Sequence, residues 1–273
     1  MRRFALILLF GLFGPALPVH AATTGWSEVH GGAVRLIATG PMEDGRYLAG
    51  LEFVLEPGWH TYWRYPGEAG VPPQITLAGS ENVRDIEVLY PAPERYSDGF
   101  SESIVYHDGI VLPIRIVPED PGRQVRFSIE VLFGVCKDIC VPGDAALSLD
   151  LAPDTETDSL AERLIARDLE AVPGAAKGGA LEITGVALSG PNDSLRIEAK
   201  VPADGTPDLF AAGPAGSYIG LPKLVDRTGE KAVWRLSTNG LASDDGDRTL
   251  RLVLTSGDVA VELLETIPPD WLN

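Results

Sequence analysis

Cysteine, methionine and histidine are scarce in this chain. Its 273 residues include two cysteines, two methionines and four histidines. Beyond the N-terminal segment, His30, His60 and His107 lie far apart in sequence, without the close spacing of paired metal ligands. The pattern therefore excludes a recognisable zinc site. The chain also lacks the G-x-S-x-G and H-E-x-x-H motifs, which argues against a serine hydrolase or a zinc protease.

Positive charge is scarce as well. Lysine and arginine together number 22 against 39 acidic residues, giving a formal net charge of -17. Such an excess of negative charge repels phosphate backbones and anionic lipid surfaces, so we exclude nucleic-acid binding. The acidic residues are scattered and 45% of the chain is hydrophobic, which indicates a solvated surface around a folded core.

Long hydrophobic runs are absent after the N-terminal segment. There, Arg2 and Arg3 precede an apolar run from Phe4 to about Leu17, and the segment closes on Val19, His20 and the small residue Ala21. This order predicts a secretory signal peptide over residues 1–21. The alternative is a membrane anchor, but glycines and prolines interrupt the run, which is shorter than the roughly 20 residues that span a bilayer. We expect an exported mature protein without a membrane span.

Glycine and proline are abundant, with 30 and 22 residues, and they separate short runs of β-type residues. The run YLAGLEFVL at 47–55 alternates as a half-buried strand does. Similar runs lie at 33–39, 74–77, 83–89, 109–117, 124–133 and 145–151. The spacing predicts an antiparallel sandwich of about eight or nine strands.

A helix follows, and then a second series of strands. Ser159 and Glu162 form a capping box, and leucines at helical spacing continue until Pro173 and Gly174. Further β-type runs lie at 181–188, 194–201, 231–236, 249–255 and 259–267. The predicted organisation is a first sandwich over residues 22–155, a helix and linker over 156–176, and a second, smaller β-sandwich over 177–273.

The two cysteines lie together in the stretch FGVCKDICVPG at residues 133–143. In an extended strand, residues four apart are separated by about 13 Å, at roughly 3.3 Å per residue. A disulfide needs Cα atoms within about 4.4 to 6.8 Å. Cys136 and Cys140 can therefore form a disulfide only if the chain turns between them, which the following Pro142 and Gly143 favour.

Two roles for such a pair remain open from the residues alone. A stapling disulfide that closes so short a loop stabilises by only about 2 kcal/mol, against about 4.7 kcal/mol for a hundred-residue loop. A dithiol at short range suits exchange, because the second sulfur resolves a mixed disulfide quickly. Lys137 favours a neighbouring thiolate and Asp138 opposes it, so the sequence does not fix the thiol pKa.

Several longer segments carry a resemblance to a known family. They are GWHTYWRYPGEAGVPP at 58–73, YPAPERYSDGF at 90–100, VYHDGIVLPIRI at 105–116 and VLFGVCKDICVPG at 131–143. Together they resemble the N-terminal periplasmic domain of the thiol:disulfide interchange protein DsbD, and more closely its variant in copper-sensitivity suppressor B proteins. The resemblance implies an immunoglobulin-like sandwich whose dithiol takes electrons from a membrane-embedded donor and reduces periplasmic thioredoxin-like or disulfide proteins, without a cofactor.

The resemblance also implies roles for single residues. Cys136 and Cys140 become the exchanging pair, and the family pattern points to Cys140 as the residue that forms the mixed disulfide. An aromatic cap loop shields the dithiol in this family, so Phe100 or else Tyr96 is the candidate cap residue. Asp98 is a candidate for assisting proton transfer. The alternative is a noncatalytic binding module, whose cysteines form a structural disulfide or hold Cu(I), which prefers soft ligands.

The sequence departs from the family pattern in two respects. Typical DsbD domains place more than three residues between their cysteines. Full-length relatives continue into a membrane segment and a thioredoxin-like domain, whereas this sequence stops at Asn273, so we expect electrons to arrive from a separate protein.

The aromatic cluster at residues 59–65, which includes His60, is predicted to pack in the sandwich core, with a partner-binding rim as the alternative.

Overall fold

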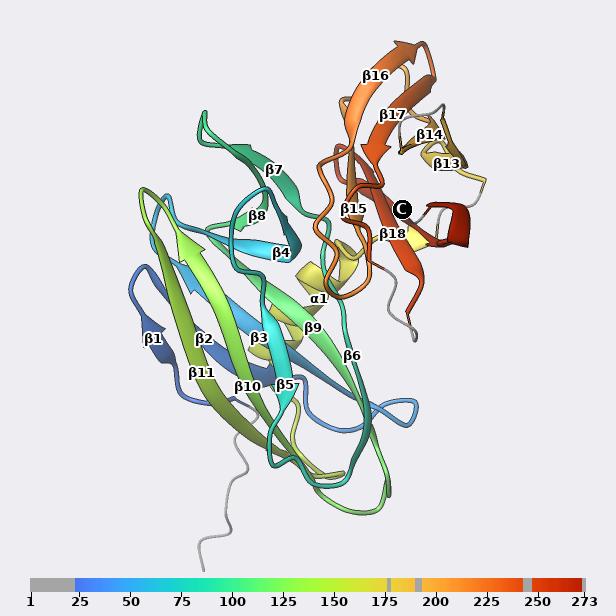
Figure 1. Cartoon of the computed structure of the whole chain (residues 1–273). Coiled ribbons are helices and arrows are strands. Elements are labelled where there is room, and N and C mark those ends of the chain that lie inside the picture. Colours follow the sequence, from blue (N-terminus) through green and yellow to red (C-terminus); the bar gives the residue numbers. More distant parts are fainter. Residues whose placement is uncertain (1–22, 176–177, 190–192, 243–246, 272–273) are drawn as a thin grey trace, which may run out of the picture.

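The computed structural model describes residues 23–175, 178–189, 193–242 and 247–271, and the predicted signal peptide lies outside these residues. The chain forms two lobes (Figure 1). The N-terminal lobe contains strands β1 to β11 with helix α1, and the C-terminal lobe contains β12 to β19. Within the described residues, no helix combines the length and the apolar character needed to cross a membrane.

The N-terminal lobe is a sandwich of two antiparallel sheets. One sheet has the order β1-β2-β3-β9-β6, and the other has the order β11-β10-β4-β8-β7 with β5 paired to β10. The strands are β1 (Ser27–Val29), β2 (Gly32–Ala38), β3 (Tyr47–Leu55), β4 (His60–Gly67), β5 (Gln74–Leu77), β6 (Val83–Val88), β7 (Glu94–Ser97), β8 (Glu102–His107), β9 (Gly109–Pro118), β10 (Val125–Cys136) and β11 (Cys140–Leu151). The predicted sandwich is confirmed, with eleven strands in place of about eight or nine.

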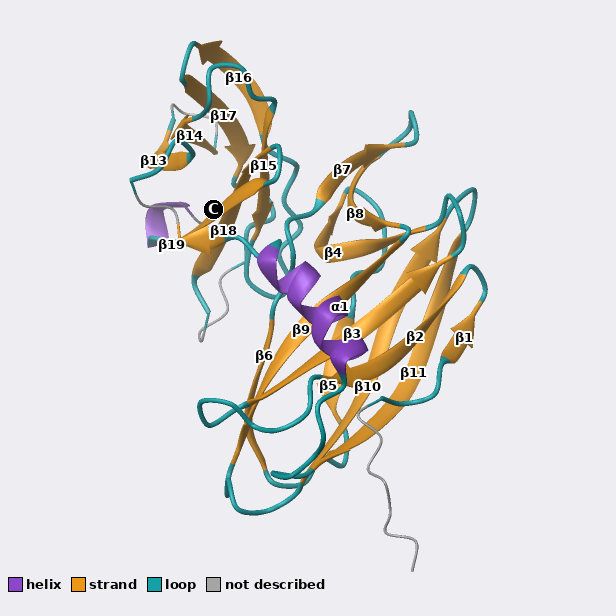
Figure 2. Cartoon of the chain, turned by 180° about the vertical axis from the view of Figure 1, so that it is seen from behind, coloured by secondary structure: helices purple, strands orange, loops and turns teal. Residues whose placement is uncertain are grey.

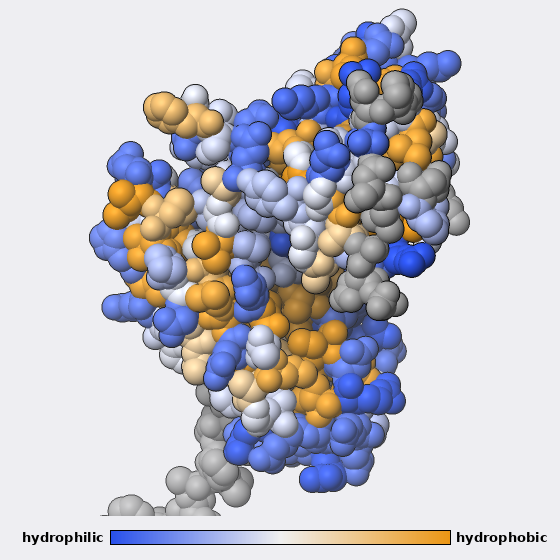
Figure 3. Space-filling view, viewed as in Figure 1, coloured by the Kyte–Doolittle hydropathy of each residue, from blue (hydrophilic) through white to orange (hydrophobic). Residues whose placement is uncertain are grey.

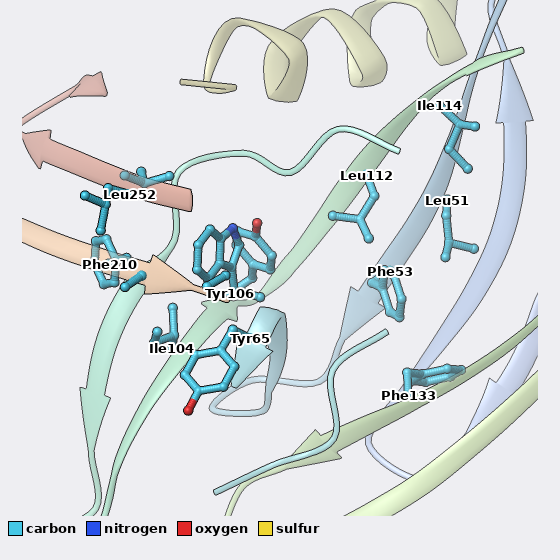
Figure 4. Close-up of a cluster of buried hydrophobic side chains, with 14 of the residues drawn as sticks. Leu51, Phe53, Tyr65, Ile104, Tyr106, Leu112, Ile114, Phe133, Phe210 and Leu252 are labelled. Carbon is cyan, nitrogen blue, oxygen red and sulfur yellow. The ribbon is translucent and has the colours of Figure 1, made fainter. Parts of the chain in front are cut away.

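The core of this lobe follows from strict alternation along its strands. On β3, Tyr47, Leu51 and Phe53 are each at most 1% exposed and face the second sheet. Phe53 meets Phe133 of β10 edge to face, with ring centroids 5.2 Å apart (Figure 4). Each such fully buried side chain contributes about 1.5 to 3 kcal/mol to stability. The interlocked rings fix β10 relative to β3, and with it the cysteine that ends β10.

Helix α1 (Ser159–Glu170) lies on the N-terminal lobe (Figure 2). Its N-cap is Asp158, whose Oδ1 accepts hydrogen bonds from the amides of Leu160 and Ala161 at 2.9 and 3.0 Å, so the predicted cap at Ser159 was one residue late. Ile165 is fully buried against the lobe, and Asp168 accepts a hydrogen bond from the Val111 amide at 2.6 Å. The helix therefore covers the first sheet on its outer face.

The C-terminal lobe is a second, smaller sandwich, as the sequence predicts. Its two four-stranded sheets have the orders β12-β19-β18-β15 and β13-β14-β17-β16. The strands are β12 (Gly174–Ala175), β13 (Glu182–Leu188), β14 (Ser194–Lys200), β15 (Pro207–Ala212), β16 (Lys223–Thr228), β17 (Lys231–Ser237), β18 (Thr249–Ser256) and β19 (Val259–Thr266), with a short 3-10 helix η1 (Pro269–Trp271) after them. The predicted domain limits at 155 and 176 stay predictions.

The two lobes share a continuous apolar junction. Trp63 of β4 lies 6.4 Å from Phe210 of β15, measured between ring centroids, and the Tyr65 hydroxyl donates to the Ile219 carbonyl. Phe210 and Leu252 lie beside Tyr65, Ile104 and Tyr106 in Figure 4. Strand β4 therefore contacts the C-terminal lobe through Trp63 and Tyr65, whereas His60 at its start is the register partner of Cys136.

Candidate redox site

The cysteines face each other at the end of the β10–β11 hairpin. Cys136 is the last residue of β10, Cys140 is the first residue of β11, and the two are register partners with Cα atoms 4.1 Å apart. A disulfide joins them. The predicted turn between the cysteines is confirmed. Both strands run further than predicted, past Phe133 and from before Ala145, because their pairing continues up to the cysteines themselves.

The two sulfur atoms lie in different surroundings. Cys136 is 2% exposed, whereas Cys140 is exposed, as is the hairpin residue before it, Ile139, at 62%. Figure 3 shows apolar residues at this end of the N-terminal lobe. A visiting thiolate must approach the sulfur that it attacks. Cys140 is therefore the more accessible of the two half-cystines.

The hydroxyl of Tyr62 on β4 donates a hydrogen bond to Cys136 Sγ and also lies near Cys140 Sγ. Its hydroxyl lies 2.7 Å from Cys136 Sγ and 3.4 Å from Cys140 Sγ. Burial, then the negative charge of Asp98 and the neighbouring Tyr96, raise the pKa of Tyr62 to about 12. The phenol therefore keeps its proton at neutral pH. A hydroxyl directed at Cys136 Sγ stabilises the negative charge that forms when this sulfur leaves.

His60 lies beside Tyr62 on the same face of β4. It is the register partner of Cys136 on β10 and of His107 on β8, and only 4% of it is exposed. Burial and then His107 lower the pKa of His60 to about 4, against the opposing charge of Asp98. The buried imidazole is therefore neutral at neutral pH, next to a sulfur that must change charge during exchange.

The pairing of β4 with β8 brings His60 and His107 together. They are 47 residues apart in the chain, yet their ring centroids lie 5.8 Å apart. Nδ1 of His107 also contacts Glu94 Oε2 at 3.1 Å. In the described ranges, no group of three or more His, Cys, Asp or Glu residues is placed to hold a metal ion. The Cu(I) alternative for Cys136 and Cys140 stays a prediction.

The two cap candidates occupy different positions. Tyr96 on β7 is partly buried and packs against the group formed by Tyr62, Val105 and Cys136. Its ring lies 4.8 Å from that of His60. Phe100, in the β7–β8 turn, is 99% exposed, so its side chain covers neither sulfur in this structure. The structure thus brings Tyr96 to the cysteines and leaves Phe100 outside, and the cap role stays a prediction for both.

Asp98 holds the turn that carries Phe100. Its Oδ1 accepts hydrogen bonds from the amides of Phe100 and Ser101, both at 2.8 Å. The bonds from Ser101 and then Phe100 lower the pKa of this exposed carboxyl. Asp98 therefore stays ionised and adds to the negative potential that raises the pKa of Tyr62. Its part in proton transfer stays a prediction.

Sequence reasoning found the cysteines and missed the polar residues of β4. The signal was present in HTYWRY at residues 60–65, because residues of one parity face the same way along a strand. His60 and Tyr62 share the face toward the cysteines, while Trp63 and Tyr65 are buried in the core. The core prediction for the cluster is therefore right for Trp59, Trp63 and Tyr65, and incomplete for His60 and Tyr62, which are buried beside the cysteines.

The fold and site together define a class of protein, an immunoglobulin-like β-sandwich with a disulfide at the end of one hairpin. Residues 34–152 match the family model for the N-terminal domain of the thiol:disulfide interchange protein DsbD. The match and the disulfide together support thiol:disulfide exchange as the general chemistry of this lobe.

A solved structure extends the likeness to both lobes. The N-terminal periplasmic domain of ScsB from Proteus mirabilis is 24% identical, with a TM-score of 0.69. The alignment covers 90% of this chain and 98% of that chain. The likeness supports the fold of both lobes, and it agrees with the resemblance to copper-sensitivity suppressor B proteins. No protein of curated function matches this chain.

Proposed function

We propose that this protein carries out thiol:disulfide exchange in the periplasm, relaying reducing equivalents through Cys136 and Cys140. The observation that carries the proposal is the asymmetry of one disulfide, with Cys140 exposed and Cys136 buried under the Tyr62 hydroxyl at 2.7 Å. A structural staple has no need of one exposed sulfur. A relay needs one sulfur open to partners and another protected until it resolves the intermediate.

The domain is reduced in two steps. A thiolate of a membrane-embedded donor attacks Cys140 Sγ, the bond between Cys140 and Cys136 breaks, and Cys136 leaves as a thiolate that accepts the Tyr62 hydrogen bond. The donor's second thiolate then attacks the donor sulfur of the mixed disulfide and releases Cys140. The donor ends as a disulfide, and this domain takes up two electrons and, from solvent, two protons.

The domain then reduces a periplasmic thioredoxin-like or disulfide protein. The Cys140 thiolate attacks one sulfur of the partner's disulfide, and the partner's other sulfur leaves as a thiolate. Cys136 loses its proton and attacks Cys140 Sγ in the mixed disulfide. The Cys136–Cys140 bond forms again, and the partner leaves with both sulfurs reduced.

The periplasmic location has two supports. Residues 1–21 have the composition of a secretory signal peptide. The solved ScsB fragment, which covers most of this chain, is described as a periplasmic domain. Disulfide exchange of this kind also fits an oxidising compartment.

Trapping in cells tests the relay. In Cys136→Ser, the remaining Cys140 forms mixed disulfides that cannot resolve, so we expect adducts on a nonreducing gel that a reductant removes. Cys140→Ser keeps only the buried sulfur and is expected to trap far less. The variant with both cysteines replaced by serine is the negative control, because it cannot form a mixed disulfide. The absence of adducts from both single variants, at normal expression levels, contradicts the proposed relay.

A further inference from the structure

Strand β7 is held on only one side by backbone hydrogen bonds. It is a four-residue edge strand, Glu94–Ser97, that pairs with β8 alone. Successive side chains of a strand point to opposite sides. Arg95 accordingly reaches into the C-terminal lobe, whereas Tyr96 packs toward His60 and Cys136. One short strand therefore connects the second lobe with the redox site.

Arg95 makes a two-pronged contact across the junction. Its Nε donates to Asp208 Oδ2 and its Nη2 to Asp208 Oδ1, both at 2.9 Å. Nη2 also lies 3.3 Å from the carbonyl oxygens of Leu209 and Pro222. All four acceptor atoms belong to the C-terminal lobe, and Figures 1 and 2 both show one end of β7 next to β15. A paired, planar contact of this kind fixes direction as well as distance.

Tyr96 forms part of the wall over the buried sulfur. Its ring lies 4.8 Å from His60 and 5.4 Å from His107, and it packs against the group that contains Cys136. The strands that carry the rest of this wall, β4 and β8, each pair with a strand on both sides. The position of β7 is therefore the part of the wall that depends most on contacts from outside its own sheet.

We infer that Asp208 of the C-terminal lobe, acting through Arg95, is a positioning residue for the redox site. The salt bridge holds β7 where Tyr96 shields Cys136, and so it sets which of the two sulfurs a visiting thiol reaches. The importance of this selectivity for exchange rests on the proposed function. The shielding itself is a property of the protein alone, because no partner is needed to measure it.

Alkylation of single cysteines by iodoacetamide tests the inference in the full-length mature protein. Cys140→Ser leaves Cys136 as the only thiol, and Cys136→Ser leaves Cys140 as an internal comparison. Into each we place Arg95→Ala, Asp208→Ala and both together. We expect alkylation of Cys136 to accelerate about tenfold in each, with no gain of the double substitution over Arg95→Ala, because Arg95→Ala already removes the contact with Asp208. Alkylation of Cys140 should change less than about twofold.

Three further variants make the result specific. Arg126→Ala removes ion pairs to Glu81 and Asp150 within the N-terminal lobe, and it should leave the Cys136 rate unchanged. Arg95→Lys keeps the charge without the paired geometry, so its rate should fall between those of the parent and Arg95→Ala. If the alanine variants do not fold, Asp208→Asn, which preserves size, decides the question.

Two results overturn the inference. One is an unchanged Cys136 rate in a folded variant that lacks the salt bridge. The other is an equal acceleration of Cys136 and Cys140, which indicates general loosening. Because alkylation involves no partner, a failed trapping experiment with a selective effect on Cys136 overturns the relay and leaves the positioning role standing.

Discussion

The two lobes are sandwiches of similar construction, and they differ in what their buried strands carry. Each has a fully buried tryptophan, Trp63 in the first and Trp234 in the second. Among the described residues, only the N-terminal lobe buries a histidine and a half-cystine, His60 and Cys136. The buried polar residues of the C-terminal lobe are a threonine and two serines. The sandwich is thus a scaffold, and the chemistry arises where a buried strand carries polar side chains to the end of a hairpin.

The largest expected effects compare the two buried tryptophans. Trp63→Ala and Trp234→Ala should each lower the free energy of unfolding by about 3 to 5 kcal/mol, because each leaves a large cavity. Urea unfolding followed by circular dichroism measures both. At urea concentrations below the unfolding transition, and with Cys140→Ser so that Cys136 is a free thiol, Trp63→Ala should also accelerate alkylation of Cys136. The reason is that β4 carries both the tryptophan and part of the wall over this sulfur. Trp234→Ala should leave the alkylation rate unchanged. Equal effects on Cys136 contradict the contrast between the lobes.

His60 makes the stability of the N-terminal lobe depend on pH. Its pKa is about 4 in the folded protein against an ordinary value of 6.5, so between these values the unfolded chain binds more protons. Above about pH 6.5 the neutral His60 does not lower the free energy of unfolding. As the pH drops toward 4, the free energy of unfolding falls by up to about 3 kcal/mol. Urea unfolding at pH 7 and pH 4.5 measures this loss. His60→Phe should flatten the dependence, and an equally steep loss in this variant contradicts the assignment to His60.

A smaller expected effect compares the Tyr62 hydroxyl, which contacts a sulfur, with the buried Tyr106 hydroxyl, which does not. Tyr62→Phe removes the donor on Cys136 Sγ, and a hydrogen bond to a charged group contributes about 1.5 to 3 kcal/mol. Reduction of the disulfide by dithiothreitol should slow about tenfold or more, because the leaving thiolate loses that stabilisation. The matched control is Tyr106→Phe, whose hydroxyl donates to the Pro91 carbonyl at 2.7 Å. It should keep the parent rate, and equal slowing in both variants assigns the effect to packing.

The sequence predicts strands well where hydrophobic residues at alternate positions mark one face. The strand at 47–55 has the predicted bounds. Strand β4 escapes prediction because large aromatic side chains occur on both of its faces, Tyr62 on one and Trp63 and Tyr65 on the other, which removes the alternation. Strand β16 escapes for the opposite reason, since all six of its residues are exposed. Periodicity reports a contrast between two faces, so it fails where no contrast exists.

The residues of the site also differ in how far the sequence predicts that they lie together. The cysteines are visible in the sequence because their pairing needs only a local turn. The proximity of His60, Tyr96 and His107 depends on the registers of β4, β7 and β8, which no local pattern encodes. The link from Asp208 to β7 depends further on how the two lobes meet. Chemistry assembled across strands thus becomes visible only with the fold.

The reduction potential of the Cys136–Cys140 couple tests the central claim most directly. Equilibration with a series of glutathione or dithiothreitol buffers, followed by counting of free thiols, gives the value. An exchanging disulfide with one exposed sulfur should have a potential above about -300 mV. A potential below that value marks a bond that resists reduction and contradicts the account.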